Sequence, residues 1–241
     1  MKIFRSQLRQ ELTVMARNGE QLLLLVVIPI MLLIFFAQTD FLPTNSENKI
    51  DFLMPGILGL AVMSTAMVSL GIATGFERSY GVLKRLGTTP LGTRRLILAK
   101  VVAICVIEIA QLVLLIFVGQ LLGWNPSRVN LAQVLGLLLI GTSCFAGIGL
   151  TLAGRLRAEI NLAAQNGLYL VLLLLGDIFV SNDELPKTLG DVAQVLPSSL
   201  LSSLLRNSFN NNELVITDAI ALGGWALSAC ALAVISFKWS D

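Results

Sequence analysis

The sequence contains no histidine, and its three cysteines are scattered. Histidine is the side chain that most often serves as a general base near neutral pH and as a metal ligand. Cys105, Cys144 and Cys230 each lie inside an apolar run, and their spacing is not that of a metal site. We therefore expect no catalytic centre, no bound cofactor and no metal site, and we interpret the cysteines as small apolar residues.

Charge is also scarce. Soluble domains carry about 25% charged residues, whereas this chain of 241 residues is 13% charged and 55% hydrophobic, with a mean hydropathy of +0.81. A chain this apolar has too little polar surface to cover a globule in water, so the composition excludes a soluble domain and indicates an integral membrane protein. The net charge of +2 gives no sign of a nucleic-acid partner, and none is expected.

Six apolar runs are long enough to cross a bilayer as helices. A transmembrane helix needs about 20 residues, and these runs are too long and too uniformly apolar for barrel strands. They cover residues 21–38, 54–75, 97–122, 131–153, 161–181 and 218–238. The predicted fold class is an all-α integral membrane protein with six transmembrane helices, formed by residues 1–241 as one domain.

Basic residues are distributed unevenly between the connecting segments. If the N-terminus lies inside the cell, thirteen of the 17 lysines and arginines fall in inner segments. Inner loops of membrane proteins are enriched in Lys and Arg, so the distribution predicts cytoplasmic N- and C-termini. It also places residues 76–96 in the cytoplasm and residues 182–213 outside.

The N-terminal segment, residues 1–20, is polar enough to lie outside the spans. Phe4, Leu8, Leu12 and Met15 recur there at helical spacing, with charged residues off that stripe. This pattern predicts an amphipathic helix in the inner membrane interface. The alternative is a frayed cytoplasmic lead.

The outer segment, residues 182–213, is only half apolar. Pro186 and Pro197 each stand where a helix can begin, because proline suits the first helical turn. Short helices are predicted near residues 186–195 and 197–208. They form either a re-entrant pair in the outer leaflet or a surface loop with two amphipathic turns.

One dense island of charge, "GFERSYGVLKRLGTTPLGTRRLILAK" at residues 75–100, lies between two apolar runs. A plain basic loop is the simpler interpretation. The segment is, however, longer than the two to six residues of a common connection, and apolar residues alternate there with Lys84 and Arg85. The pattern favours a short amphipathic helix along the inner surface, followed by a turn at Pro90 and Gly92.

This segment resembles the first cytoplasmic loop of type-2 ABC transporter permeases, especially their drug-exporter branch. The matching residues are Glu77, Arg78, Gly81, Leu83, Lys84, Arg85, Leu86, Thr89, Pro90, Leu91 and Lys100. The outer segment resembles that of the same family through Leu185, Pro186, Leu196, Pro197, Leu205 and Arg206. It departs from the family at its start, where Asp177, Asp183 and Glu184 replace an apolar stretch.

The resemblance implies that the inner loop is a coupling helix docked on a separate ATP-hydrolysing subunit. It implies two permease chains, as a homodimer, and two ATPase chains that hold ATP and Mg. Under it, Glu77, Arg78, Gly81, Lys84, Arg85 and Pro90 contribute to ATPase coupling. The chain itself has no G-x-x-x-x-G-K-[ST] motif to wrap phosphates, so it is not expected to be an enzyme alone. The cargo would be a hydrophobic or amphipathic compound, such as a drug, an antibiotic or a lipid, exported across the cell membrane.

Glu108 lies near the middle of the third predicted span, with Gln111 three residues on and on the same face. A carboxylate there costs several kcal/mol unless it is paired, wet or protonated. It either lines the translocation path or is a protonated side chain bonded to a neighbouring helix. The alternative function is a self-contained ion-coupled transporter or channel centred on Glu108, for which the sequence shows no second such residue and no repeat.

Two further expectations concern packing and the outer end of the fifth span. Gly141, Gly147 and Gly149 leave span four thin, which predicts close helix contacts. Asp177 lies close to the outer interface and is expected to be solvated.

Overall fold

The computed structural model describes residues 2–39, 49–126, 129–210 and 214–237, and all regular structure within these ranges is helical. The predicted all-α class is confirmed. The helices are α1 (Lys2–Arg17), α2 (Gly19–Gln38), α3 (Lys49–Met63), the π-helical segment η1 (Ser64–Ser69), α4 (Leu70–Ser79), α5 (Val82–Gly87), α6 (Thr93–Leu121), α7 (Leu131–Ala153), α8 (Ala158–Leu174), the 3-10 turn η2 (Asn182–Glu184), α9 (Lys187–Ala193), α10 (Pro197–Asn210) and α11 (Ile216–Ser236).

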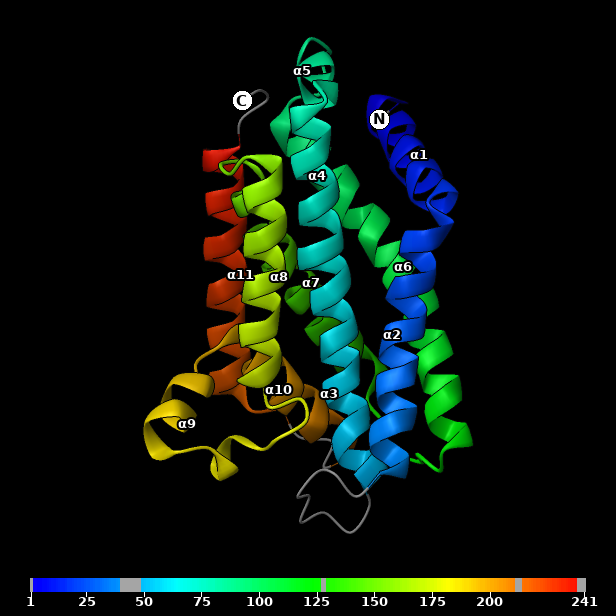
Figure 1. Ribbon diagram of the computed structural model, residues 1–241, viewed down its shortest axis with the longest axis vertical. Helices are drawn as coiled ribbons and strands as arrows, with labels where there is room; N and C mark the ends of the chain where they lie inside the picture. Colours follow the sequence, from blue (N-terminus) through cyan, green and yellow to red (C-terminus); the bar gives the residue numbers. More distant parts are fainter. Residues whose placement is uncertain (1, 40–48, 127–128, 211–213, 238–241) are drawn as a thin grey trace.

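The long helices run roughly along one axis of the molecule (Figure 1). Those long and apolar enough to cross a membrane are Gly19–Gln38, Lys49–Ser79, Thr93–Leu121, Leu131–Ala153 and Ile216–Ser236. Helix α8 is apolar but has only 17 residues. The chain is therefore a multi-pass membrane protein, and a sixth crossing by α8 stays a prediction.

Helix α8 ends earlier than the predicted span 161–181, so that boundary was wrong. The helix stops at Leu174, and the chain then turns through Gly176 and Asp177. Asp177 has a positive φ of 52°, the left-handed conformation that ends a helix. Apolar composition continues to residue 180, so hydropathy alone extends the helix past its end.

The second span is longer than the predicted residues 54–75. Helix α3, η1 and α4 follow one another without a break from Lys49 to Ser79. The π-helical turn at Ser64–Ser69 lies in the middle, where each backbone N–H reaches one residue further back than in an α-helix. No residue pattern in the sequence indicated it.

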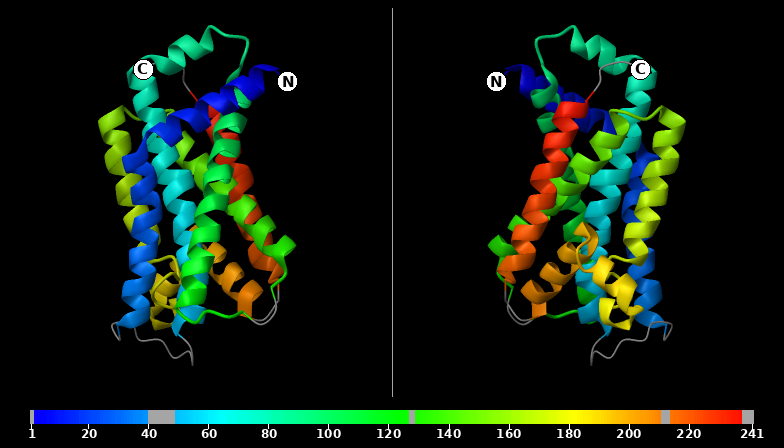
Figure 2. Two further views of the ribbon diagram at one scale, coloured as in Figure 1. Left: turned by 90° about the vertical axis from the view of Figure 1, so that its right-hand side faces the viewer. Right: turned by 90° about the vertical axis from the view of Figure 1, so that its left-hand side faces the viewer.

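The two ends of the molecule carry different elements. Helices α1 and α5 and the last residues of α11 lie at one end, and α9 and α10 lie at the other (Figures 1 and 2). The short helices predicted in residues 1–20, 76–96 and 182–213 are all present. Helix α10 packs against α3, α7 and α11, and most of its side chains are buried. Re-entry of α9 and α10 into a leaflet stays a prediction.

Glycines on α7 allow the close packing that the sequence predicted. A Cβ on Gly147 would lie 2.6 Å from the backbone carbon of Ala229 in α11. A Cβ on Gly149 would lie 2.5 Å from the carbonyl oxygen of Met67 in η1. Both contacts are with backbone, which cannot rotate away, so α7 needs glycine at both positions.

Gly149→Ala is expected to destabilise the fold by about 1–3 kcal/mol, because the added methyl group overpacks the contact between α7 and η1. The free energy of unfolding can be measured by SDS titration in mixed micelles, followed by circular dichroism. Gly136→Ala is the matched control, since it lies on the same helix and its Cβ would have no neighbour within 4 Å. Equal stability of the two variants would contradict the close approach.

Candidate functional site

Helix α5 forms a short connection between α4 and α6 at one end of the molecule (Figure 1). Gly81, with φ 71°, precedes α5, and Gly92, with φ 72°, precedes α6. Positive φ favours glycine, so these two residues permit the turns on either side. The predicted helix and turn are thus present, although α5 has only six residues.

The two faces of this connection differ in polarity. Leu83 on α5 forms a buried cluster with Leu91 and Leu96, and Leu86 packs against it. Lys84 and Arg85 are exposed on the opposite side, and so is Pro90 in the turn. The buried leucines hold the apolar face of α5 against the rest of the chain. Lys84 and Arg85 therefore point outward from a helix that is fixed in place.

A buried lysine ties this region to the N-terminal helix. The Nζ atom of Lys100 on α6 lies 2.7 Å from an Oε of Glu77 on α4 and 3.0 Å from an Oε of Glu11 on α1. The lysine side chain is 1% exposed. Gln7 donates a further hydrogen bond of 2.7 Å to Glu11. This cluster of Glu11, Glu77 and Lys100 fixes α1, α4 and α6 to one another beside α5.

Arg78 connects the same region to the segment between α7 and α8. It is 4% exposed, and its guanidinium donates a hydrogen bond of 2.5 Å to the carbonyl oxygen of Leu156. Glu77 and Arg78 therefore face the chain's own helices, whereas Lys84 and Arg85 face outward. A docking role for any of these residues stays a prediction, and the geometry favours Lys84 and Arg85 as the direct contacts.

Glu108 is buried between α6 and α7. Its carboxyl group lies 2.5 Å from the hydroxyl of Thr142, which also lies 2.8 Å from the carbonyl oxygen of Leu138. Thr142 is the donor in its contact with Glu108, so this hydrogen bond joins α6 to α7. This arrangement favours the interpretation of Glu108 as a helix-to-helix contact, and its role in a translocation path stays a prediction.

Gln111 is also buried, one turn further along α6. It accepts a hydrogen bond of 3.0 Å from Thr65 in η1 and donates one of 2.7 Å to the carbonyl oxygen of Leu25 in α2. Gln111 thus joins three helices by polar contacts inside an apolar bundle. Such contacts stabilise membrane helix packing.

Asp177 is not solvated as expected, so that interpretation was wrong. It is 6% exposed, and its carboxylate lies 2.5 Å from the guanidinium of Arg206 on α10. Arg206 also donates to the carbonyl oxygen of Asp177 at 2.8 Å and lies 3.8 Å from the ring centroid of Phe52. This ion pair holds the segment after α8 against α10 and α3.

A mostly apolar groove of about 360 Å³ lies between α2, the η1–α4 region and α8. Its polar lining residues are Gln21, Ser64, Ser69, Asn166 and Tyr169, and its apolar ones include Leu24, Ile28, Val68 and Ile72. Gln21 donates a hydrogen bond of 2.5 Å to Ser69 across it. Sequence reasoning missed this groove, because its lining comes from three helices far apart in the chain.

Sequence reasoning also missed Glu11 and did not assign a partner to Lys100. For Lys100 the signal was present, since it lies two turns inside an apolar helix, where a charge needs a partner or a route to water. Pairing them requires the order of helices in space, which hydropathy does not give.

Comparisons with known proteins give a family match and one similar protein. A family model described as "ABC-2 type transporter" matches residues 3–210. A Bacillus subtilis (strain 168) protein described as "Putative transport permease YvfS" is 26% identical over 204 residues, which cover 82% of each chain.

Proposed function

The chain belongs to the ABC-2 type transporter family, and from this we propose that it is the permease subunit of an ATP-driven exporter. Energy would come from a separate ATPase chain that binds ATP and Mg, since this chain has no phosphate-binding motif. The complex would contain two permease chains and two ATPase chains in the cell membrane, with the permease termini in the cytoplasm.

The observation that carries this proposal is the outward-facing cationic surface of α5. The helix sits between two long helices whose adjoining ends are tied by the Glu77–Lys100 ion pair. A force applied to Lys84 and Arg85 would therefore move α4 and α6 together. Closure of ATPase subunits needs a stiff contact of this kind to act on membrane helices.

The groove between α2, the η1–α4 region and α8 supports a hydrophobic or amphipathic compound as the transported substrate. Apolar walls with a few polar groups are typical of sites for drug-sized molecules. We propose that this groove takes a hydrophobic or amphipathic compound, and that a second permease chain covers its open side. Glu108 and Gln111 are both buried among the helices of the single chain. They could line a translocation path together with this groove only if the surrounding helices moved apart.

The double variant Lys84→Glu/Arg85→Glu tests the coupling role of α5. Co-expressed with the ATP-binding cassette ATPase encoded next to it, the wild-type chain is expected to co-purify with that ATPase from detergent. Charge reversal should reduce the recovered ATPase at least about tenfold, because two outward cations become anions at the docking surface.

Arg155→Glu/Arg157→Glu is the matched control, because these arginines are exposed in the α7–α8 connection, outside α5. It is expected to retain most of the ATPase. Failure of wild type to bind, or equal loss in both variants, would count against coupling through α5. Attention would then move to Glu108 and ion-coupled transport.

A further inference from the structure

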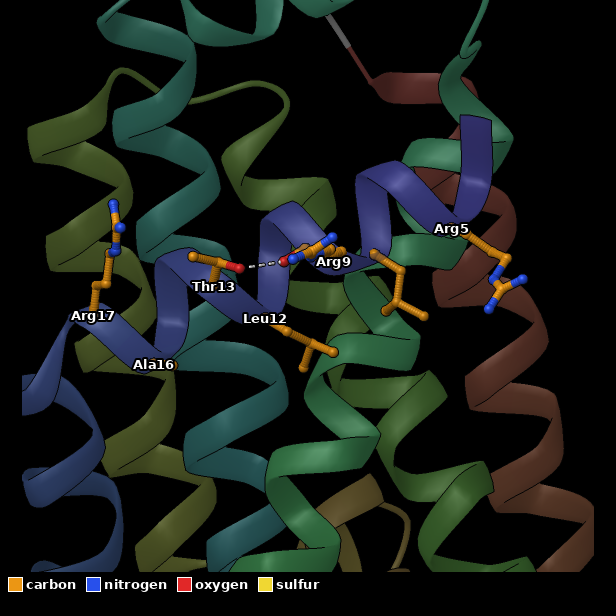
Figure 3. Close-up of a pocket in the computed structure, with 7 residues that line it drawn as sticks. Arg5, Arg9, Leu12, Thr13, Ala16 and Arg17 are labelled. Carbon is orange, nitrogen blue, oxygen red and sulfur yellow. Dashed lines mark hydrogen bonds between the residues drawn. The ribbon is translucent and has the colours of Figure 1, made fainter. Parts of the chain in front are cut away.

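Helix α1 carries a basic surface that the coupling proposal does not use. An open, shallow groove, here called the α1 groove, runs along this one helix and is lined by Arg5, Leu8, Arg9, Leu12, Thr13, Ala16 and Arg17. Figure 3 shows Arg5, Arg9 and Arg17 spaced along the helix, with Leu12, Thr13 and Ala16 between them. The small side chains of Thr13 and Ala16 leave the space that the arginines border.

The groove is on a different side of α1 from its contact with the rest of the chain. Gln7 and Glu11 are buried, with Glu11 paired to Lys100, whereas Arg5, Arg9 and Arg17 are exposed. None of these arginines forms an ion pair with a carboxylate in the described part of the chain. Three guanidinium groups are thus available to an anion.

The position of α1 places this groove at the membrane boundary. Helix α1 ends at Arg17, and the membrane-spanning α2 begins at Gly19, so only Asn18 separates them. Helix α6, against which α1 packs, exposes Leu98, Val106 and Ile109 along its length. A ligand at this depth meets both cations and apolar surface.

We propose that the α1 groove binds anionic phospholipids of the adjoining leaflet. Arg5 and Arg9, about one turn apart, would contact one lipid phosphate, and Arg17, about 12 Å further along the helix, would contact the phosphate of a neighbouring lipid. Guanidinium groups form bidentate hydrogen bonds with phosphate oxygens. Leu8 and Leu12 would contact the start of the acyl chains. Because Glu11 on the same helix pairs with Lys100, a bound lipid would also hold α1 in its place beside α4 and α6.

The test is a titration of the delipidated permease, in detergent, with dioleoyl phosphatidylglycerol, using the midpoint of thermal unfolding as readout. Phosphatidylglycerol is expected to raise the midpoint, and dioleoyl phosphatidylcholine is expected to raise it much less. In Arg5→Gln/Arg9→Gln/Arg17→Gln the apparent affinity for phosphatidylglycerol should fall on the order of 100-fold. The control variant Arg94→Gln/Arg95→Gln/Arg155→Gln removes three positive charges from exposed positions outside α1. It should keep the wild-type affinity for phosphatidylglycerol.

Several outcomes would overturn the proposal. These are equal shifts by the two lipids, an unchanged affinity in the α1 variant, or the same loss in the control variant. A shift by glycerol 3-phosphate equal to that by the lipid would show a site for free phosphate instead. Loss of ATPase co-purification in the α1 variant with lipid binding intact would assign the arginines to a protein partner. The binding assay contains no ATPase, so its result is separate from that of the coupling test.

Discussion

Lys100→Met is expected to lower the free energy of unfolding by about 3–5 kcal/mol, because it leaves two inward-facing carboxylates without their shared cation. Glu11 and Glu77 approach Lys100 from different helices, and after the substitution they would repel each other. SDS titration of the detergent-solubilised chain, followed by circular dichroism, measures the change. Tritium or deuterium exchange of α1 amides should also rise, since α1 loses its polar contact with α6.

The triple variant Lys100→Met/Glu11→Gln/Glu77→Gln separates charge from packing. Neutral amides in place of the carboxylates remove the repulsion, so most of the lost stability should return. Lys84→Met is the surface control, because that lysine is exposed on α5, and a change below about 0.5 kcal/mol is expected there. If the triple variant is no more stable than Lys100→Met, the charge cluster is not the source of the effect.

Arg206→Leu is the second substitution with a large expected effect. It removes the guanidinium that pairs with Asp177 and lies over the ring of Phe52. The buried carboxylate then loses its cation, and we expect a loss of about 3 kcal/mol. The same SDS titration measures it, and limited proteolysis should cut the α8–α10 connection sooner because that segment loses its anchor.

Asp177→Asn in the Arg206→Leu background should recover part of the loss, since it removes the buried negative charge that Arg206 had faced. Lys187→Leu is the control for the same outer segment, where the lysine is exposed on α9. It should leave the stability within about 0.5 kcal/mol of wild type. A Lys187→Leu effect as large as that of Arg206→Leu would mean that the ion pair contributes nothing specific.

Local composition was enough to predict the helices of this fold and part of the candidate site. The amphipathic stripe of Phe4, Leu8, Leu12 and Met15 predicted α1, and Pro186 and Pro197 marked the beginnings of α9 and α10. Each of these signals lies within the element it predicts. The exposed pair Lys84 and Arg85 was likewise visible, because their apolar neighbours fix the direction in which α5 faces.

Long-range pairing could not be predicted in the same way. Lys100 and Glu11 are 89 positions apart, and Arg206 and Asp177 are 29 apart. The sequence of each helix shows only that it carries a charge that needs a partner. Several oppositely charged residues elsewhere in the chain could be that partner. The π-helical turn at Ser64–Ser69 could not be predicted for the same reason, since its polar contacts, Thr65 with Gln111 and Ser69 with Gln21, join η1 to α6 and α2. Such features follow from the helix arrangement as a whole.

Helix α6 has a mechanical consequence through its length. It has 29 residues, so at a rise of 1.5 Å per residue it is about 43 Å long, and a tilt of about 5° around its far end moves the α5 end by roughly 4 Å. Lys100 lies two turns from the α5 end of this rod. About three-quarters of that displacement, roughly 3 Å, therefore reaches α1 through the lysine, and only about a third reaches the contact of Gln111 further along. A push on α5 would swing the N-terminal helix while the opposite end of the bundle stays almost still.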